Sequence, residues 1–332
     1  MRATGCPASA MRRKGDMTTT QSRSADGAPS ETRPKKRSGW LGFVLIGLAA
    51  FLVVAGLLFQ FWAPDQLKRA PIDTDEVTEL EGVALLPANF AEPTNLEQAD
   101  IRVYQGTKSD TDASDDDVSV YDEYTCLLRD IGELDGCVDA EDPEGRLVTA
   151  ELDRYATDRR TGEAVNDVKY VGEDALPHAG LINKFPFDVE KKSYEIWDGV
   201  IGDTMEAKFV EESTLKGLDV YVFETDVTAE DVNILSDVKG TYVNQATWYV
   251  DPVTGSIVGK KEHQERYLDG EDLVLNLDFE MTDAEYTQKV DDAKSNIKLL
   301  NLVTFIVPIA FYVVGALCLV AGALLVRRRR TA

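Results

Sequence analysis

Histidine and the common catalytic motifs are nearly absent from this sequence. Of 332 residues only His178 and His263 are histidine, and neither lies in an HExxH arrangement, which would place two metal ligands on one helix face. The chain also lacks the G-x-S-x-G, P-loop and CxxC motifs. We therefore expect a protein that is not an enzyme, with no cofactor and no catalytic or metal-binding residues.

Basic residues are few relative to acidic ones. The chain has 35 lysines and arginines against 59 aspartates and glutamates, which gives a net charge of −24. Nucleic acids and bare anionic lipid surfaces would be repelled by such a charge. We expect no nucleic-acid partner, and we interpret most of the acidic residues as a solvated surface.

The acidic run from Asp110 to Asp117 lacks two residues that a calcium loop requires. Counted from Asp110, an EF-hand needs Gly at position six and Glu at position twelve, whereas this chain has Asp115 and Tyr121. A solvated loop between strands is the preferred interpretation, and calcium binding is the alternative.

Two long segments contain no charged residue. Residues 40–62 form a run of 23, and Leu299–Val326 a run of 28, whereas about 20 apolar residues suffice to cross a bilayer. We expect transmembrane helices at 40–62 and 303–326. A cleaved signal peptide is the alternative for the first run. Phe61 and Trp62 occupy the place where cleavage needs small residues, so an uncleaved signal anchor is favoured.

Basic residues flank both apolar runs and predict the orientation of the chain. Residues 33–37 precede the first run with four of them, and Arg327–Arg330 follow the second. Because such residues resist translocation, both termini should be cytoplasmic. We expect a double-pass protein of the cytoplasmic membrane, with a disordered tail at 1–39, an extracytoplasmic domain at 63–281 and a basic tail at 327–332.

Small residues form a stripe in the second run, where Gly315 and Gly322 lie seven positions apart. Such a stripe lets another helix approach closely. Pairing of the two spans within one chain is the simplest use, and a homodimer or a partner membrane protein is the alternative.

Cys126 and Cys137 are the only cysteines between the two runs. Thiols oxidise outside the cytoplasm, and the short loop between these two can close if strands bring them together. We predict a Cys126–Cys137 disulfide.

A β-rich pattern fills the region between the runs. Apolar residues alternate from Val118 to Leu128, and turn signals separate further strand-like runs at 146–155, 206–212, 218–226, 245–250, 256–267 and 271–281. We expect a mainly β domain, an antiparallel meander or a barrel-like sheet, built from short strands.

The motif D-x-x-T-G-x-x-V occurs at 158–165 and again at 251–258. It describes a hairpin turn in which Asp accepts backbone hydrogen bonds and Gly supplies a positive φ. Two related β subdomains would explain the repeat, and independent use of a common turn is the alternative.

A helix is expected before the second span. Thr282 and Glu285 have the spacing of a capping box, and good helix formers follow. We expect a membrane-proximal helix at 282–302 that runs into the span and holds the domain rigidly.

Aromatic residues and lysines gather between Gly180 and Asp198. We interpret this segment as a surface for an amphiphile, with aromatic rings against acyl chains and lysines against head groups. An aromatic core around an extended turn at Pro186 is the alternative. The candidate ligand-binding residues are Lys184, Phe185, Phe187, Lys191, Lys192, Tyr194 and Trp197.

At these motifs the chain resembles the actinobacterial porin PorA family. The resemblance rests on G-L-x-x-K-F-P-F-x-x-x-K-K-x-Y-x-x-W-D (180–198), on D-R-x-T-G (158–162), on the later D-P-x-T-G (251–255) and on the two terminal apolar runs. It covers nearly all of residues 40–326 and implies an envelope location and a cell-wall channel. Short, acidic strands do not match the apolar alternation of a membrane β-barrel.

Three functions therefore compete. The preferred hypothesis is a non-enzymatic cell-envelope protein whose β domain binds a lipid, a wall component or a partner protein. The alternative is a subunit of a porin-like channel. The third is an accessory subunit of a transport or wall-synthesis complex.

Overall fold

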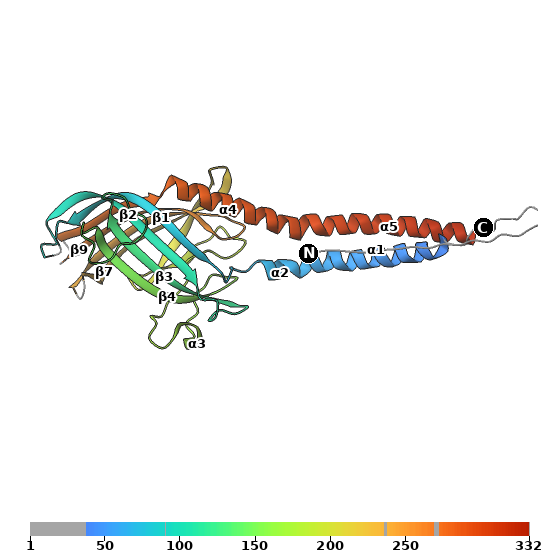
Figure 1. Cartoon of the computed structure of the whole chain (residues 1–332), viewed down its shortest axis with the longest axis horizontal. Helices are drawn as coiled ribbons and strands as arrows, with labels where there is room; N and C mark the ends of the chain where they lie inside the picture. Colours follow the sequence, from blue (N-terminus) through green and yellow to red (C-terminus); the bar gives the residue numbers. More distant parts are fainter. Residues whose placement is uncertain (1–37, 90, 236–237, 269–271, 332) are drawn as a thin grey trace, which may run out of the picture.

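A curled β-sheet and two long helices make up the protein in the computed structural model (Figure 1). The structure describes residues 38–331, apart from 90, 236–237 and 269–271. The tail at 1–39 that was predicted to be disordered therefore lies almost entirely outside the described residues.

The chain runs through the following elements. The helical ones are α1 (Ser38–Phe61), α2 (Ala63–Leu67), α3 (Val168–Val171), α4 (Asp283–Asn301), the π-helical turn η1 (Leu302–Ile306) and α5 (Val307–Arg330). The strands are β1 (Asp75–Pro87), β2 (Leu96–Ser109), β3 (Val118–Arg129), β4 (Leu147–Asp158), β5 (Tyr194–Asp198), β6 (Asp203–Leu215), β7 (Leu218–Leu235), β8 (Val238–Val250), β9 (Ile257–Leu268) and β10 (Asp272–Met281).

The ten strands form one antiparallel sheet in the order β4-β3-β2-β1-β10-β9-β8-β7-β6-β5. Neighbours in sequence pair with each other, and the first strand pairs with the last, with Leu80 opposite Met281. The sheet curls into a half-barrel whose free edges are β4 and β5 (Figure 1). The predicted barrel-like meander is thus confirmed, and all strands belong to one continuous sheet.

The segment between the edge strands partly bridges them. Single bridges join Thr157 to Ala164, Glu163 to Leu181, and Leu181 to Ile196. These contacts tie β4 to β5 through a few backbone hydrogen bonds rather than through a ladder.

The expectation of short strands was wrong. Nine of the ten strands have at least 10 residues, and β7 has 18. Charged residues such as Glu79 and Glu81 break the apolar alternation of β1, and this concealed the length of the strand from a pattern search.

Apolar side chains on the concave face of the sheet pack against α4 and form the core together with it. Tyr286 of α4 packs in a cluster with Leu80, Ile101 and Leu277. Val290 and Ala293, further along α4, pack with Val220 and Val258. The helix therefore lies against the sheet along its apolar stripe.

The start of α4 follows the predicted cap only in part. Thr282 Oγ1 accepts a hydrogen bond from Glu285 N at 3.1 Å. Thr282 N, however, donates to Glu79 O on β1 rather than to the Glu285 carboxylate. The backbone of β1 therefore accepts the hydrogen bond that the Glu285 carboxylate would accept in a complete capping box. This bond joins the start of α4 directly to the sheet.

From α4 the helix continues through η1 into α5, and α1 packs beside α5 (Figure 1). Two helices, Trp40–Phe61 and Asp283–Arg328, are long and apolar enough to cross a membrane. Tyr312 Oη donates to Gln60 Oε1 across the helix pair at 2.7 Å.

The predicted disulfide is present. Cys126 on β3 bonds to Cys137 in the following loop, and their Cα atoms lie 5.9 Å apart. It fastens the long loop between β3 and β4 to the sheet.

Candidate functional site

The curled sheet surrounds a cavity of about 770 Å³, which we call the lumen. Side chains alternate between the faces of a strand, so every second residue points inward. At one end the lumen is bordered by Ala70 and Pro71, which follow α2, and by residues 292–296 of α4. The lumen therefore extends to the part of the domain from which the apolar helices leave.

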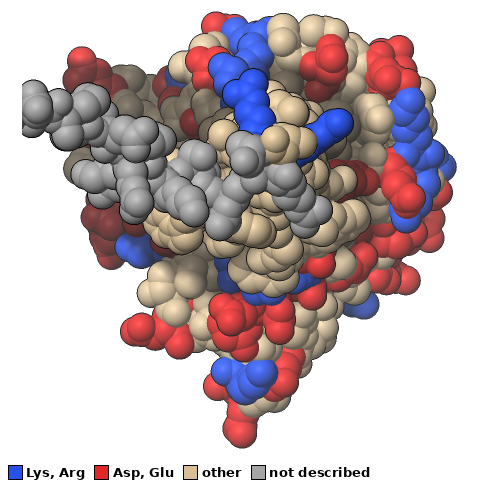
Figure 2. All heavy atoms as spheres, turned by 90° about the vertical axis from the view of Figure 1, so that its right-hand side faces the viewer, with Lys and Arg blue, Asp and Glu red and all other residues tan. Residues whose placement is uncertain are grey.

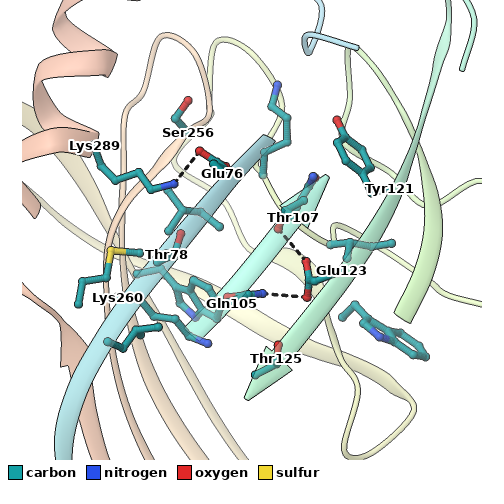
Figure 3. A pocket seen from close by; sticks show the side chains of 18 of the residues that line it. Glu76, Thr78, Gln105, Thr107, Tyr121, Glu123, Thr125, Ser256, Lys260 and Lys289 are labelled. Carbon is teal, nitrogen blue, oxygen red and sulfur yellow. Dashed lines mark hydrogen bonds and ion pairs between the residues drawn. The ribbon is translucent and has the colours of Figure 1, made fainter. Parts of the chain in front are cut away.

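Polar residues outnumber apolar ones among those that line it, although apolar atoms make up slightly more than half of the lining surface. The inward-facing polar side chains include Glu76, Thr78, Gln105, Thr107, Tyr121, Glu123, Thr125, Glu151, Asp153, Lys184, Asp198, Asn244, Lys260, Glu262, Gln264 and Lys289. Figure 3 shows Gln105, Thr107, Tyr121, Glu123 and Thr125 projecting from neighbouring strands into the same space. Carboxylates outnumber ammonium groups in this set.

Glu123 on β3 is held by three neighbours. Its carboxylate accepts hydrogen bonds from Gln105 Nε2 at 2.8 Å, Thr107 Oγ1 at 3.2 Å and Tyr155 Oη at 2.9 Å. Burial nevertheless raises the pKa of Glu123, and the Asp153 carboxylate directly opposite on β4 adds to the effect. The hydrogen bonds fix the carboxylate in place without fully offsetting its desolvation.

A second buried network lies on the opposite wall. Asn244 Nδ2 donates to Asp198 Oδ2 at 3.1 Å and to Glu262 Oε1 at 2.8 Å. Tyr242 Oη donates to the same Asp198 oxygen at 3.1 Å, and Lys260 Nζ forms an ion pair with Glu262. The Lys260 ammonium lowers the pKa of Glu262 against the opposing effect of burial. This network keeps two carboxylates fixed beside the lumen.

The histidines do not form a catalytic pair. His178 is buried and its Nε2 lies 2.8 Å from Asp153 Oδ2, while its ring packs 4.6 Å from the ring of Trp197. His263 lies elsewhere, on β9, with Nδ1 2.8 Å from Asp278 Oδ1. Within the described residues there is no group of three or more histidine, cysteine or acidic side chains that could hold a metal ion.

The two D-x-x-T-G turns lie on either side of the Lys184–Pro186 backbone. In both turns the Asp side chain accepts backbone hydrogen bonds, from Arg160 and Thr161 to Asp158 and from Val253 and Thr254 to Asp251. The glycines have φ of +78° and +75°. The predicted turns are therefore present.

Because glycine has no side chain, the backbone of residues 184–186 can pass close to both turns. A Cβ at Gly162 would lie 2.8 Å from Lys184 O, and one at Gly255 would lie 2.1 Å from Phe185 O. Phe185 N also donates to Gly255 O at 2.8 Å. The motifs on which the family resemblance rests thus meet in space as a clamp around residues 184–186.

The clamp separates the candidate ligand residues into several environments. Phe185 is fully buried against Phe223 and Tyr194, as the core alternative predicted, so its ring is not available to a ligand. Lys184 and Trp197 line the lumen. Phe187 lies over the Lys184 ammonium.

The remaining lysines of the segment point to solvent. Lys191 forms an ion pair with Glu212, and Lys192 with Glu190 at 2.6 Å. The structure therefore does not bring the seven residues together on one face. Most lumen residues, among them Glu123 and Gln105, had no sequence signal beyond their alternation within a strand.

The two glycines of α5 lie against α1. A Cβ at Gly322 would be 2.8 Å from Gly42 O, and one at Gly315 would be 3.5 Å from Ala49 O. Pairing of the two helices within one chain is therefore the arrangement that the structure contains.

Acidic side chains also dominate the exterior. Figure 2 looks along the helices toward the domain, and acidic residues are spread over much of the surface around them, with fewer basic residues between. Acidic residues are thus common both in the lumen and on this face of the domain.

The comparisons with known proteins point to one family. A curated relative, Porin PorA of Corynebacterium amycolatum, is 27% identical to this chain. The aligned part covers 58% of this chain and 58% of that relative, so the chain spans less than two thirds of the relative's length. The family model described as Porin PorA matches residues 41–324, from α1 to α5 and including both turns of the clamp. The chain therefore belongs to the Porin PorA family.

Proposed function

We propose that this protein is a subunit of a cell-wall channel and that the half-barrel supplies its polar lumen. The observation that supports this most strongly is the lumen itself, a space of about 770 Å³ whose wall is lined by charged and hydrogen-bonding side chains. An ordinary sheet interior of this size would be filled by apolar groups. The relative's name and the family match support the same function.

The lumen charge predicts which solutes pass. Glu123, Glu151 and Asp153 face a space in which Lys260 and Lys289 are each already paired with a carboxylate, that of Glu262 and that of Glu76. An acidic lumen with low-dielectric walls concentrates cations and excludes anions. The channel should therefore prefer cations.

The proposed arrangement places α1 and α5 in the cytoplasmic membrane, with both termini in the cytoplasm. Residues 63–281 then form the extracytoplasmic domain and α4 its membrane-proximal support. The basic residues that flank both helices support this orientation.

Reconstitution in planar bilayers tests the proposal. Purified full-length protein should give discrete conductance steps, and a salt gradient should give a reversal potential of the sign expected for cation preference. Protein with both helices intact but with β4 and β5 deleted is the matched control, because it keeps the anchors and loses the half-barrel edges. Absence of steps from the wild-type protein, or equal steps from the control, would count against a channel.

A second candidate function is the binding of a lipid or wall component inside the lumen. The incomplete ladder between β4 and β5 favours it, because a sheet that does not close leaves a lateral entry. The rings of Trp197, Trp248 and Tyr121 in the lining would contact the apolar part of such a ligand. Mass spectrometry of protein extracted in mild detergent should then detect a stoichiometric envelope molecule, and Thr125→Trp, which fills the lumen, should displace it.

A further inference from the structure

Lys184 differs from the other two lysines that line the lumen. Lys260 pairs with Glu262, and Lys289 lies 3.0 Å from Glu76. The Lys184 side chain is partly exposed overall, but its Nζ is buried and makes no hydrogen bond or ion pair with any residue that the structure describes. Its nearest counterpart is the Phe187 ring, whose centroid lies 3.8 Å away.

An ammonium in this position is costly to maintain without a partner. Burial without compensation disfavours the charged form of a lysine. Accordingly burial lowers the pKa of Lys184 to about 7, and the Asp158 carboxylate offsets only part of this shift. The group thus changes charge near neutral pH and gains most from a ligand that supplies negative charge.

The clamp fixes the backbone that carries this side chain. The glycines of the two D-x-x-T-G turns hold the backbone of residues 184–186, and Phe185 is anchored in the core directly after Lys184. The clamp therefore fixes the backbone from which the Lys184 side chain enters the lumen wall.

A second donor without an acceptor lines the same lumen. Trp248 belongs to the core cluster that contains Phe185, and its Nε1 is buried without a partner among the described residues. Asn183 Oδ1, beside Lys184, has no donor there. The lumen wall thus holds further polar atoms without a partner among the described residues.

We propose that Lys184 is the centre of an oxyanion-binding site in the lumen wall, which takes the carboxylate or phosphate group of a molecule that enters the lumen. The carboxylates elsewhere in the lumen repel free anions, so only an anion bonded directly to Lys184 is retained. The site gives a cation-preferring lumen one position where an acidic solute is held. It depends on the lumen wall and stands whether or not the lumen conducts.

Calorimetric titration of the full-length protein in detergent micelles tests the site. The probes are sodium acetate and inorganic phosphate, each measured at constant ionic strength. Wild-type protein should bind at least one of them saturably. The substitution Lys184→Met should weaken binding at least tenfold, because it removes the charge and keeps the length of the side chain. Lys192→Met is the matched control, since Lys192 lies eight residues away, is exposed and pairs with Glu190.

Two further variants keep the test informative if Lys184→Met unfolds. Lys184→Arg retains the charge and should retain binding, whereas Lys184→Gln keeps a donor without the charge and should weaken it. Acetate affinity should fall when the pH rises from 6 to 8.5, because Lys184 loses its proton in that range. Retention of the disulfide and an unchanged circular dichroism spectrum establish that each variant is folded.

The outcomes separate the ligand classes. Binding of both probes identifies a general oxyanion site, and binding of phosphate alone identifies a phosphate-ester site. Failure of folded wild-type protein to bind either probe saturably, or equal affinities in wild type and Lys184→Met, would overturn the site. A protein that binds these anions but gives no conductance would overturn the channel and leave the site intact.

Discussion

Lys289 Nζ on α4 lies 3.0 Å from Glu76 Oε2 on β1, so an ion pair joins the helix that leads to the second apolar segment with the first strand of the sheet (Figure 3). The same two residues line the lumen where it reaches α4. The pair thus belongs both to the support of the domain and to the border of the cavity.

Breaking this pair should loosen α4 with a small loss of stability. Lys289 is mostly buried, but Glu76 is half-exposed, so we expect Lys289→Met to cost about 0.5–1 kcal/mol in the free energy of unfolding. Urea unfolding of Lys289→Met, Glu76→Gln and the double variant would measure the coupling between the two. Lys208→Met, which removes a largely exposed lysine near Glu206, is the control. Strictly additive effects would show that the ion pair contributes nothing.

The raised pKa of Glu123 predicts a stability that falls as pH rises. Between its pKa in the unfolded chain and its higher pKa in the folded protein, the folded state binds more protons, so stability decreases through this window. Glu123→Gln should remove this dependence. The variant should therefore gain stability relative to wild type near pH 7, and the gain should disappear below about pH 4, near the unfolded pKa of a glutamate. Thermal unfolding at a series of pH values would detect the difference, and a constant offset at all pH values would contradict it.

The charge of the lumen should set ion preference. Glu151 faces the lumen from β4, so Glu151→Lys should shift the reversal potential toward anions. Glu173→Lys makes the same change in charge at an exposed position that does not line the lumen, and it should leave the reversal potential unchanged. Equal shifts in both variants would mean that the overall charge, rather than the lumen, determines preference.

Contact between the two long helices should depend on Gly322. Since a Cβ there would lie 2.8 Å from Gly42 O, Gly322→Leu should force α1 and α5 apart and lower the melting temperature of the protein in detergent. The control is Gly47→Ala, because a Cβ at Gly47 meets nothing within 4 Å. Similar melting temperatures in both variants would show that this close approach does not stabilise the fold.

The features that could be predicted from the sequence are those carried by local patterns. The apolar runs, the Thr282 cap, the disulfide and both D-x-x-T-G turns each depend on residues close together in the chain. The position of Lys184 could not be predicted in this way. It results from two turns about 90 residues apart that enclose the same backbone, and only the pairing of β1 with β10 and the curl of the sheet bring them together.

Phe185 is a second residue whose environment could not be predicted from the sequence. An aromatic ring beside lysines has the composition of a ligand surface, but neighbouring side chains on an irregular segment point in different directions. Phe185 enters the core and Lys184 faces the lumen, although they are adjacent in sequence. The residue composition of this segment marked it as a candidate ligand surface. Tertiary contacts, however, decide which of its side chains enter the core and which line the lumen.

The pairing of β1 with β10 also constrains the order in which the molecule is assembled during synthesis. β1 is the first strand to emerge, yet it lies in the interior of the sheet and its second neighbour is the last strand to be made. Until residues 272–281 are available, β1 and β9 both expose unpaired backbone. The helix that begins at Asp283 follows immediately, so completion of the sheet coincides with delivery of the second apolar helix to its partner α1. A chain truncated before β10 would therefore present two unpaired strand edges, β1 and β9, in addition to β4 and β5, and no helix pair, and it should be a preferred substrate for envelope quality-control proteases.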